Sequence, residues 1–184
     1  MKTLGVLVAT ILFSATPSFA AGRGAIGPSD HQLFSDVSKA VNSYAHFTIF
    51  DDVNAEVHDG VVTLTGKVTM PYKKSGIAGR IARVQGVRHV RDRITVLPVS
   101  RFDDQLRARI ARAIYGNSNF RSYAALANPP IHIVVDRGRV TLTGVVQSEV
   151  DRAIARSLAA DFDAPVDSEL KTNAELRDAL EQLS

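Results

Sequence analysis

Apolar and polar residues alternate in two stretches of the chain, residues 53–65 and 131–143. The alternating apolar positions are Val53, Ala55, Val57, Val62 and Leu64 in the first stretch, and Ile131, Ile133, Val135, Val140 and Leu142 in the second. A period of two is typical of a strand that has one face on a core. A short polar turn with a glycine, Gly60 or Gly138, interrupts each stretch, so each stretch is predicted to be a β-hairpin.

The two hairpins are copies of one repeat. The pattern Gly-x-Val-Thr-Leu-Thr-Gly occupies residues 60–66 and again residues 138–144, at an offset of 78. Its second glycine, Gly66 or Gly144, falls on the apolar face of the predicted strand. We expect the missing side chain there to leave room for a helix to approach the sheet closely.

A helical period surrounds each hairpin. The helices predicted before the hairpins cover His31 to Val41 and Asp103 to Tyr115. After the hairpins, the predicted core positions are Ile77, Ile81 and Val84 in the first copy and Val150, Ile154, Leu158 and Phe162 in the second. Pairing Ile77 with Ile154 shortens the offset to 77, and third strands at 90–95 and 166–171 shorten it to 76. We expect the deletions behind this shortening to lie in loops.

These elements predict an α+β fold of two tandem α-β-β-α-β units. Each unit is expected to be a three-stranded mixed sheet with two helices packed on one face, because a helical crossover joins parallel strands. The predicted boundaries are 1–20 for a signal peptide, 21–30 for a flexible lead, 31–99 and 100–172 for the two units, and 173–184 for a C-terminal helix. Thr172 and Glu175 have capping-box spacing, and we expect the last helix to cover part of the second unit.

The repeat resembles the BON domain of bacterial envelope proteins. Gly60 and Gly66, then Gly138 and Gly144, stand where BON domains carry their glycines, and the resemblance covers residues 31 to about 172. The second copy departs from the family at 162–166, where the turn glycine that the first copy has at Gly86 is missing. The resemblance implies a non-enzymatic protein that binds phospholipid surfaces or other envelope components and supports envelope integrity under osmotic stress.

The N-terminus has the composition of an export signal. Lys2 precedes an apolar run from Leu4 to Phe13, and small residues end at Ala20, after which we expect cleavage. A membrane anchor is the alternative, but the apolar run is shorter than the roughly 20 residues that span a bilayer. The mature chain is therefore expected in the periplasm, with no transmembrane segment. This compartment disfavours nucleic acid as a partner, although the net charge of the full sequence is +3.

Residues that could carry catalysis are few. The chain has no cysteine, and its histidines, His31, His46, His58, His89 and His132, form no close ligand pair in the sequence, so no metal and no cofactor is predicted. We interpret Asp51-Asp52 and Asp103-Asp104 as turn or helix-start residues. His132 is expected to face away from the core.

Arginines are the better candidates for binding. Arg107, Arg109 and Arg112 lie on one predicted helix and Arg121 follows it, and we assign these four residues to a contact with anionic phospholipid. A solvated helix face is the alternative. A second group, Arg80, Arg83, Arg88, Arg91 and Arg93, lies in the first unit. The long connection from Gly116 to Pro130 carries Phe120 and Tyr123, which could insert into lipid or pack on the core.

The rival function is a module for protein interaction or assembly. Each predicted sheet has a face without helices, bearing Thr63 and Thr65 in one unit and Thr141 and Thr143 in the other. Each sheet also has edge strands that could pair with a partner.

Overall fold

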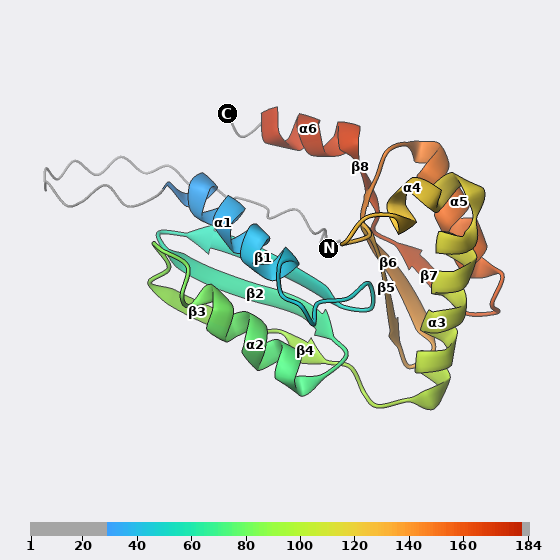
Figure 1. The fold of residues 1–184 in the computed structure, drawn as a ribbon, viewed down its shortest axis with the longest axis horizontal. Coiled ribbons are helices and arrows are strands. Elements are labelled where there is room, and N and C mark those ends of the chain that lie inside the picture. The colour runs from blue at the N-terminus through green and yellow to red at the C-terminus, as the bar shows by residue number, and fades with distance from the viewer. Residues whose placement is uncertain (1–28, 182–184) are drawn as a thin grey trace, which may run out of the picture.

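The computed structural model describes residues 29–181, and these form two α-β-β-α-β units followed by a helix (Figure 1). The first unit contains α1 (Asp30–Asn42), β1 (Asp52–His58), β2 (Val61–Val68), α2 (Pro71–Ile81), β3 (His89–Asp92) and β4 (Thr95–Val96). The second contains α3 (Arg101–Gly116), a 3-10 turn η1 (Ser118–Phe120), α4 (Arg121–Ala124), β5 (Ile131–Asp136), β6 (Arg139–Val146), α5 (Glu149–Ala160), β7 (Val166–Ser168) and β8 (Lys171–Thr172). Helix α6 (Asn173–Glu181) ends the described chain. The predicted signal peptide and the cleavage at Ala20 lie outside these residues.

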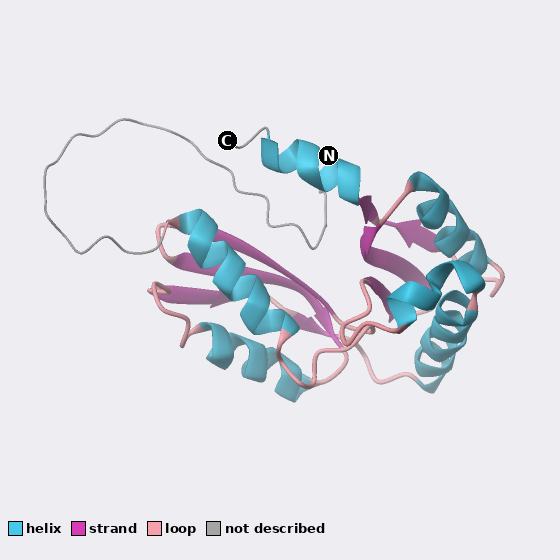
Figure 2. Cartoon of the chain, turned by 45° about the horizontal axis from the view of Figure 1, so that its top comes forward, coloured by secondary structure: helices cyan, strands magenta, loops and turns pink. Residues whose placement is uncertain are grey.

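Both sheets have the predicted mixed topology. In the first unit β1 pairs antiparallel with β2, and β3 and β4 pair parallel with β2. Strands β5 to β8 repeat this arrangement in the second unit. The two long helices of each unit lie on one face of its sheet (Figure 2). The α+β class and the tandem repeat are thereby confirmed.

The third strand of each unit is divided in two. Between β3 and β4 the chain turns Ile94 into the core, and between β7 and β8 it does the same with Leu170; both residues are 1% exposed. The backbone stays attached to the sheet across the break, because the Arg93 N–H donates to the Leu64 carbonyl and the Glu169 N–H to the Leu142 carbonyl. An irregular backbone here therefore adds one more side chain to each core.

The hairpin turns have the predicted form. Asp59 and Gly60 have φ values of 48° and 74°, and Arg137 and Gly138 have 52° and 77°. Two successive residues with positive φ are typical of a type I′ turn, whose twist matches that of the flanking strands.

The second glycine of the repeat has a different role from the one we expected. Gly66 and Gly144 have φ values of 116° and 106°, a region that L side chains rarely adopt. A Cβ on Gly144 would lie 1.9 Å from the Pro130 carbonyl oxygen, and one on Gly66 would lie 2.2 Å from that of Asp52. The glycine therefore makes room for the backbone of the neighbouring strand, and our expectation that it makes room for a helix was wrong.

The core face of α5 also differs from the predicted stripe. Its buried residues are Ala155 and Ala159, whereas Val150 is 65% exposed and Ile154 is only partly buried. In α2 the buried residues are Lys73, Ile77 and Ile81. An offset of 78 relates Ile77 and Ile81 to Ala155 and Ala159, so the offset does not shorten in the helix, and pairing Ile77 with Ile154 was wrong.

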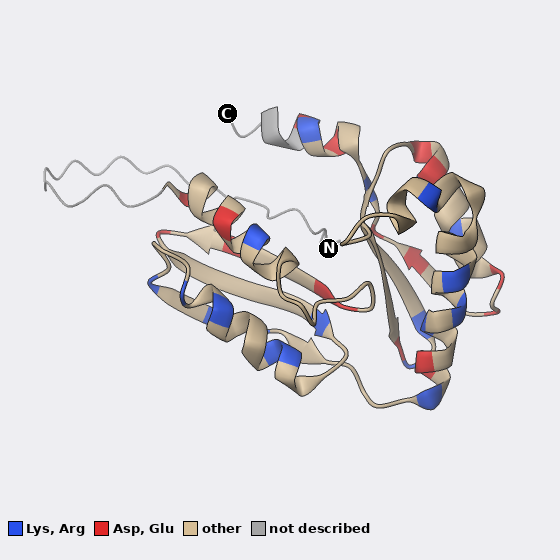
Figure 3. Ribbon diagram, in the orientation of Figure 1, with Lys and Arg blue, Asp and Glu red and all other residues tan. Residues whose placement is uncertain are grey.

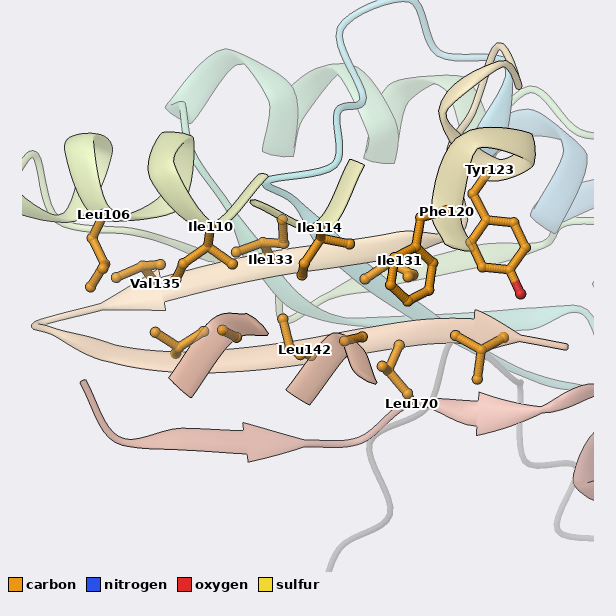
Figure 4. Close-up of a cluster of buried hydrophobic side chains, with 14 residues drawn as sticks. Leu106, Ile110, Ile114, Phe120, Tyr123, Ile131, Ile133, Val135, Leu142 and Leu170 are labelled. Atoms are coloured by element: carbon orange, nitrogen blue, oxygen red, sulfur yellow. The ribbon is translucent and has the colours of Figure 1, made fainter. Parts of the chain in front are cut away.

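Each unit has its own hydrophobic core, and the two buried clusters share no residue. In the second unit Leu106, Ile110 and Ile114 of α3 lie over β5 and β6, and the connection from α3 to β5 adds Phe120 and Tyr123 (Figure 4). Phe120 is 0% exposed and Tyr123 is 5% exposed. Of the two interpretations of these aromatic residues, packing on the core is the one that the structure shows.

The C-terminal helix is present, but it does not cover the second unit as we expected. Thr172 and Glu175 form the predicted capping box: Glu175 accepts the Thr172 N–H at 2.8 Å, and the Glu175 N–H donates to the Thr172 hydroxyl at 3.2 Å. Arg152 of α5 adds an ion pair to Glu175 at 3.0 Å. Beyond this anchor α6 extends away from the sheet (Figure 1). The first turn of α6 is therefore fixed to the second unit, and the rest of the helix extends away from it.

Candidate functional site

A buried ion pair lies where β1 begins. The Asp51 carboxylate is 0% exposed and lies 2.6 Å from the Lys73 ammonium, which comes from the first turn of α2. The same carboxylate accepts the N–H and hydroxyl of Thr48 and the N–H and hydroxyl of Thr69. Lys73 also donates to both of these hydroxyls, so every polar atom of the pair that needs a partner has one. This network ties the segment before β1 to the start of α2.

Burial alone would raise the pKa of the Asp51 carboxyl. The hydrogen bonds from Lys73, Thr69 and Thr48 outweigh burial and hold that pKa below its ordinary value. Asp51 is therefore ionised at neutral pH. Our interpretation of Asp51 as an ordinary turn residue was wrong, and the sequence contained the signal: Lys73 occupies the same helical stripe as Ile77 and Ile81, where a lysine needs a buried partner.

The second unit has a counterpart of this network that contains no lysine. At the offset of 78, Asp151 takes the place of Lys73 and Gln147 that of Thr69. Pro129 stands at the position of Asp51, and the Tyr123 hydroxyl supplies the missing oxygen: it accepts the Gln147 N–H at 2.7 Å and donates to Asp151 at 3.1 Å. The long connection before β5 thus completes the fold of its own unit, which explains why Tyr123 is buried.

The residues just before and within β1 also join the two units. The segment 47–52 leaves the first unit and lies along β5, where the Ile133 N–H donates to the Ile49 carbonyl at 2.7 Å. Side chains add two more links: the Thr143 hydroxyl donates to Asp52 at 3.0 Å, and Lys67 is 2.6 Å from Asp136. We call this contact the seam.

The seam covers the helix-free face of the second sheet. Val134 and Thr143 lie on that face and are only 4% and 2% exposed. Thr63 and Thr65 occupy the corresponding face of the first sheet, and both are half-buried. The two faces that we expected to be equally open are therefore different, and around Thr143 the second one is occupied within the chain.

His132 lies inside the seam. It faces away from the core of its own unit, as predicted, and it is nevertheless 8% exposed because the first unit covers it. Its Nδ1 atom lies 2.6 Å from the Asp51 carbonyl oxygen, which can only accept, so Nδ1 carries the proton. Phe47 packs on the imidazole ring, with the ring centroids 5.3 Å apart.

Burial lowers the pKa of His132 below its ordinary value, and the nearby carbonyl and carboxylates of Asp51 and Asp52 offset this only in part. Burial likewise raises the pKa of Asp52, and the hydrogen bond from Thr143 opposes that rise without cancelling it. Burial and the negative charge of Asp52 together raise the pKa of Glu169. His132, Asp52 and Glu169 therefore resist being charged, whereas the hydrogen bond from Lys67 lowers the pKa of Asp136.

We expect the contribution of His132 to the stability of the seam to be lost in mild acid. A histidine whose pKa is lower in the folded than in the unfolded state contributes stability above the unfolded value, near 6.5, and loses it as the pH falls below that value. The loss is at most about 1.4 kcal/mol per pH unit for one proton. Denaturant unfolding of the wild type and of His132→Gln between neutral pH and about pH 5 measures it, with the wild type showing the steeper decline.

His89→Gln is the matched control for this measurement, because His89 lies on the exposed edge strand β3. Its pH dependence should follow the wild type. Parallel curves for the wild type and His132→Gln would contradict the assignment of His132 as a buried neutral group.

A cavity of about 550 Å³ opens beside the seam. Phe47, Ile49, Pro130 and Val145 give it mostly apolar walls, and His132 is the one ionisable residue in its lining. Such a volume lies within the range of small-molecule pockets. The lining also contains the Thr48 hydroxyl, which donates to Asp51 at 2.7 Å and not to His132.

One group of described residues has the spacing of a cation site. Carboxylate and imidazole atoms of Asp30, His58 and Asp59 lie within 4.8 Å of one another near the β1–β2 turn. Their arrangement follows from turn contacts, because Asp30 accepts the Asp59 N–H at 3.0 Å and His58 lies 3.4 Å from the Asp59 carboxylate.

The four arginines assigned to lipid binding do not form one surface. Arg107 is 5% exposed: its guanidinium donates to the Val135 carbonyl at the edge of β5 and lies 3.3 Å from Asp104. Assigning Arg107 to a surface contact was therefore wrong, because the edge carbonyl of β5 needs a donor and Arg107 supplies it.

The other three arginines are exposed. Arg109 and Arg112 share a face of α3, and Arg121 begins α4, which packs against α3. The Arg109 guanidinium carbon lies 4.9 Å from the centroid of the Phe162 ring. None of the three forms an ion pair with another described residue. We call Arg109, Arg112 and Arg121 the α3 patch.

Within the described residues, two units of one α-β-β-α-β module are joined by a polar seam, and no helix among them is long and apolar enough to cross a membrane. Such a chain is a tandem repeat of one small α+β domain. A family model described as BON domain matches residues 29–98 and 102–174. The chain therefore belongs to the BON domain family and carries two copies of the domain, a family that is generally non-catalytic and associated with the envelope.

Other comparisons find only distant similarity. Two solved structures of CdsD, a structural protein of the type III secretion system of Chlamydia trachomatis, are similar to this chain at TM-scores of 0.34 and 0.33 and at 17% and 14% identity. The alignments cover 82% and 84% of this chain and 65% and 71% of those chains, so this chain spans 65% of the length of the first. Among curated proteins, no match was found.

Proposed function

We propose that this protein is exported to the periplasm, loses residues 1–20, and binds peripherally to anionic phospholipid of the bacterial envelope, where it supports envelope integrity under osmotic stress. The observation that carries the proposal is the α3 patch, with its three exposed arginines that have no acidic partner among the described residues. A basic side chain near an anionic bilayer contributes about 1 kcal/mol to binding.

Apolar groups next to the patch favour a membrane over a soluble anion. Phe162 lies under Arg109, and Leu126, in the loop that follows α4, is 52% exposed. A bilayer interface accommodates arginine and apolar side chains together. A free phosphate ion would contact only the charged arginine side chains and not the apolar groups beside them.

Co-sedimentation with vesicles tests the proposal. The wild type should bind vesicles that contain phosphatidylglycerol, bind phosphatidylcholine vesicles much more weakly, and lose affinity as salt is added. The triple variant Arg109→Gln, Arg112→Gln and Arg121→Gln should lose about 3 kcal/mol of binding, roughly a hundredfold in partition.

A control variant with the same change in charge is Arg101→Gln, Arg137→Gln and Arg139→Gln. These arginines are exposed and lie near the start of α3 and near the β5–β6 turn. Acidic residues are close to them; Arg139, for example, is 3.0 Å from Asp167. The control should bind vesicles within about twofold of the wild type. Equal, negligible binding of the wild type to both lipids would end the proposal.

A further inference from the structure

The cavity beside the seam is built from both units. The first unit supplies Asn42 and residues 47–49, and the second supplies residues 127–130 together with His132, Gly144 and Val145. The Asn128 side chain ties the two walls together, because its amide group donates to the Asn42 carbonyl at 2.9 Å. A molecule in this cavity would therefore touch both units at once.

The chain around the cavity carries no full charge. Residues 40–50 and 122–135 contain no lysine, arginine, aspartate or glutamate, although 22% of the chain is charged (Figure 3). The nearby Asp51 carboxylate is buried and already paired with Lys73 at 2.6 Å. A charged molecule would lose its hydration here without gaining an ionic partner, so the cavity favours an uncharged one.

Rings form much of the apolar wall. Phe47, Pro129 and Pro130 all line the cavity, and Ile49 and Val145 complete its apolar surface. Proline rings lose almost no side-chain entropy when they are covered. Aromatic rings prefer to stack with an offset or to meet edge to face. These walls therefore favour a rigid, planar apolar body.

His132 is the polar group that such a body would meet. Its Nδ1 atom is hydrogen-bonded to the Asp51 carbonyl, so Nε2 carries a lone pair. The Thr48 carbonyl near the ring can only accept, and no described residue donates to Nε2. A buried acceptor without a donor is costly, and His132 is only 8% exposed.

The imidazole edge that carries Nε2 faces the cavity. A Cβ on Gly144 would lie 3.6 Å from Cδ2 of His132, the ring carbon bonded to Nε2, and Gly144 itself lines the cavity. The Nδ1 atom, on the other side of the ring, is turned to Asp51. The cavity therefore presents one hydrogen-bond acceptor at the base of an apolar, uncharged space.

We infer that this cavity binds a small, uncharged, planar molecule with one hydroxyl or N–H group, which donates to Nε2 of His132. Its apolar body would lie against Phe47 and Pro130. A volume of about 550 Å³ is ample for a body of fused rings. The inference is independent of the proposed lipid binding, because no arginine of the α3 patch lines the cavity.

Naphthol is the probe that tests the inference, without vesicles and on the full mature chain. It is planar, uncharged at neutral pH and fluorescent, and the chain has no tryptophan to interfere. One molecule per chain should bind with a Kd of about 10–100 μM. Methoxynaphthalene cannot donate and should bind about tenfold more weakly. Naphthoate should bind at least as weakly, because its carboxylate would be buried without a cation.

Nuclear magnetic resonance of the imidazole protons locates the bound probe. Naphthol should shift the ring signals of His132 and leave those of His89, on the exposed strand β3, unchanged. This readout needs no substitution in the cavity. A shift at another histidine in place of His132 would overturn the inference.

Filling the cavity gives a second test. Val145→Phe should lower the affinity for naphthol about tenfold or more, because the larger side chain occupies the space that the probe needs. Val150→Phe makes the same change at a residue that is 65% exposed and outside the lining, and it should bind like the wild type. Thermal melts without the probe show whether both variants are folded; Ala127→Phe, at an exposed position of the lining, replaces Val145→Phe if that variant is not.

Two further results would contradict the inference. If the wild type shows no saturable binding of naphthol, or if the filled variant binds it as well as the wild type, the cavity is not the site. Equal binding of naphthol and methoxynaphthalene would overturn the hydrogen bond to His132 and with it the assigned class of molecule. Each of these results would leave the proposed binding to vesicles standing.

Discussion

Replacing Lys73 with methionine is expected to lower the free energy of unfolding by about 3–5 kcal/mol. The Asp51 carboxylate is fully buried, and Lys73 is the cation beside it, at 2.6 Å. Methionine fills much of the same volume but leaves that negative charge uncompensated in the interior. Because the network also fixes the segment before β1, the loss should reach the seam as well as the first core.

Denaturant unfolding followed by far-ultraviolet circular dichroism measures this effect, since the chain has no tryptophan to serve as a fluorescent probe. Lys39→Met is the matched control: Lys39 is 72% exposed and lies 3.5 Å from Asp36, so its loss should cost less than about 1 kcal/mol. In a double-mutant cycle with Asp51→Asn, the two single losses should sum to more than the loss in the double variant. A Lys73→Met protein as stable as the control would contradict the assignment of a buried ion pair.

Local patterns predicted the elements well, because the hairpins and helices depend on period and turn chemistry. The alternation around Gly60 and Gly138 specified two hairpins, and both turns have the positive φ values that such turns require. The repeat itself then predicted that the two units share one topology, since two copies of one pattern satisfy the same packing rules.

Contacts between distant parts of the chain were not visible in those patterns. Asp51 and Lys73 are 22 positions apart, and His132 meets Asp51 across 81 positions. Periodicity shows which face of an element is apolar, but it does not show which polar residue will be buried by a second unit. The seam depends on such residues. The one signal in the sequence was Lys73, whose place in the apolar stripe of α2 indicated a buried ion pair.

The candidate lipid-binding surface was predicted only in part, because the contacts of its arginines with distant backbone groups were not visible in the sequence pattern. A helix of arginines specifies a basic face, yet the first of them, Arg107, lies one turn after Asp103 and over the edge of β5, where an unpaired carbonyl draws it in. Whether an arginine is a ligand contact or an internal donor depends on the backbone next to it.

The second large effect is expected at Gly144, where alanine should destabilise the protein by about 3–5 kcal/mol. A methyl group there would meet the Pro130 carbonyl oxygen at 1.9 Å, and the residue would keep a φ of 106° that alanine strongly disfavours. The backbone cannot shift easily, because the same carbonyl accepts the Val145 N–H at 3.1 Å. Pro130 also lines the cavity beside the seam, so the change should loosen the contact between the units.

Gly79→Ala separates this explanation from a general sensitivity to side chains at glycine positions. Gly79 lies inside α2, and a Cβ there would meet nothing within 4 Å, so alanine should stabilise the protein by about 0.5–1 kcal/mol. Thermal and denaturant unfolding of both variants give the comparison. If Gly144→Ala is as stable as Gly79→Ala, the repeat glycine does not serve the close approach of two strands, and its recurrence at Gly66 needs another physical cause. If alanine lowers the stability at Gly144 and raises it at Gly79, the Gly-x-Val-Thr-Leu-Thr-Gly pattern is a backbone requirement of the module. Each copy then meets this requirement independently of the charges on its surface.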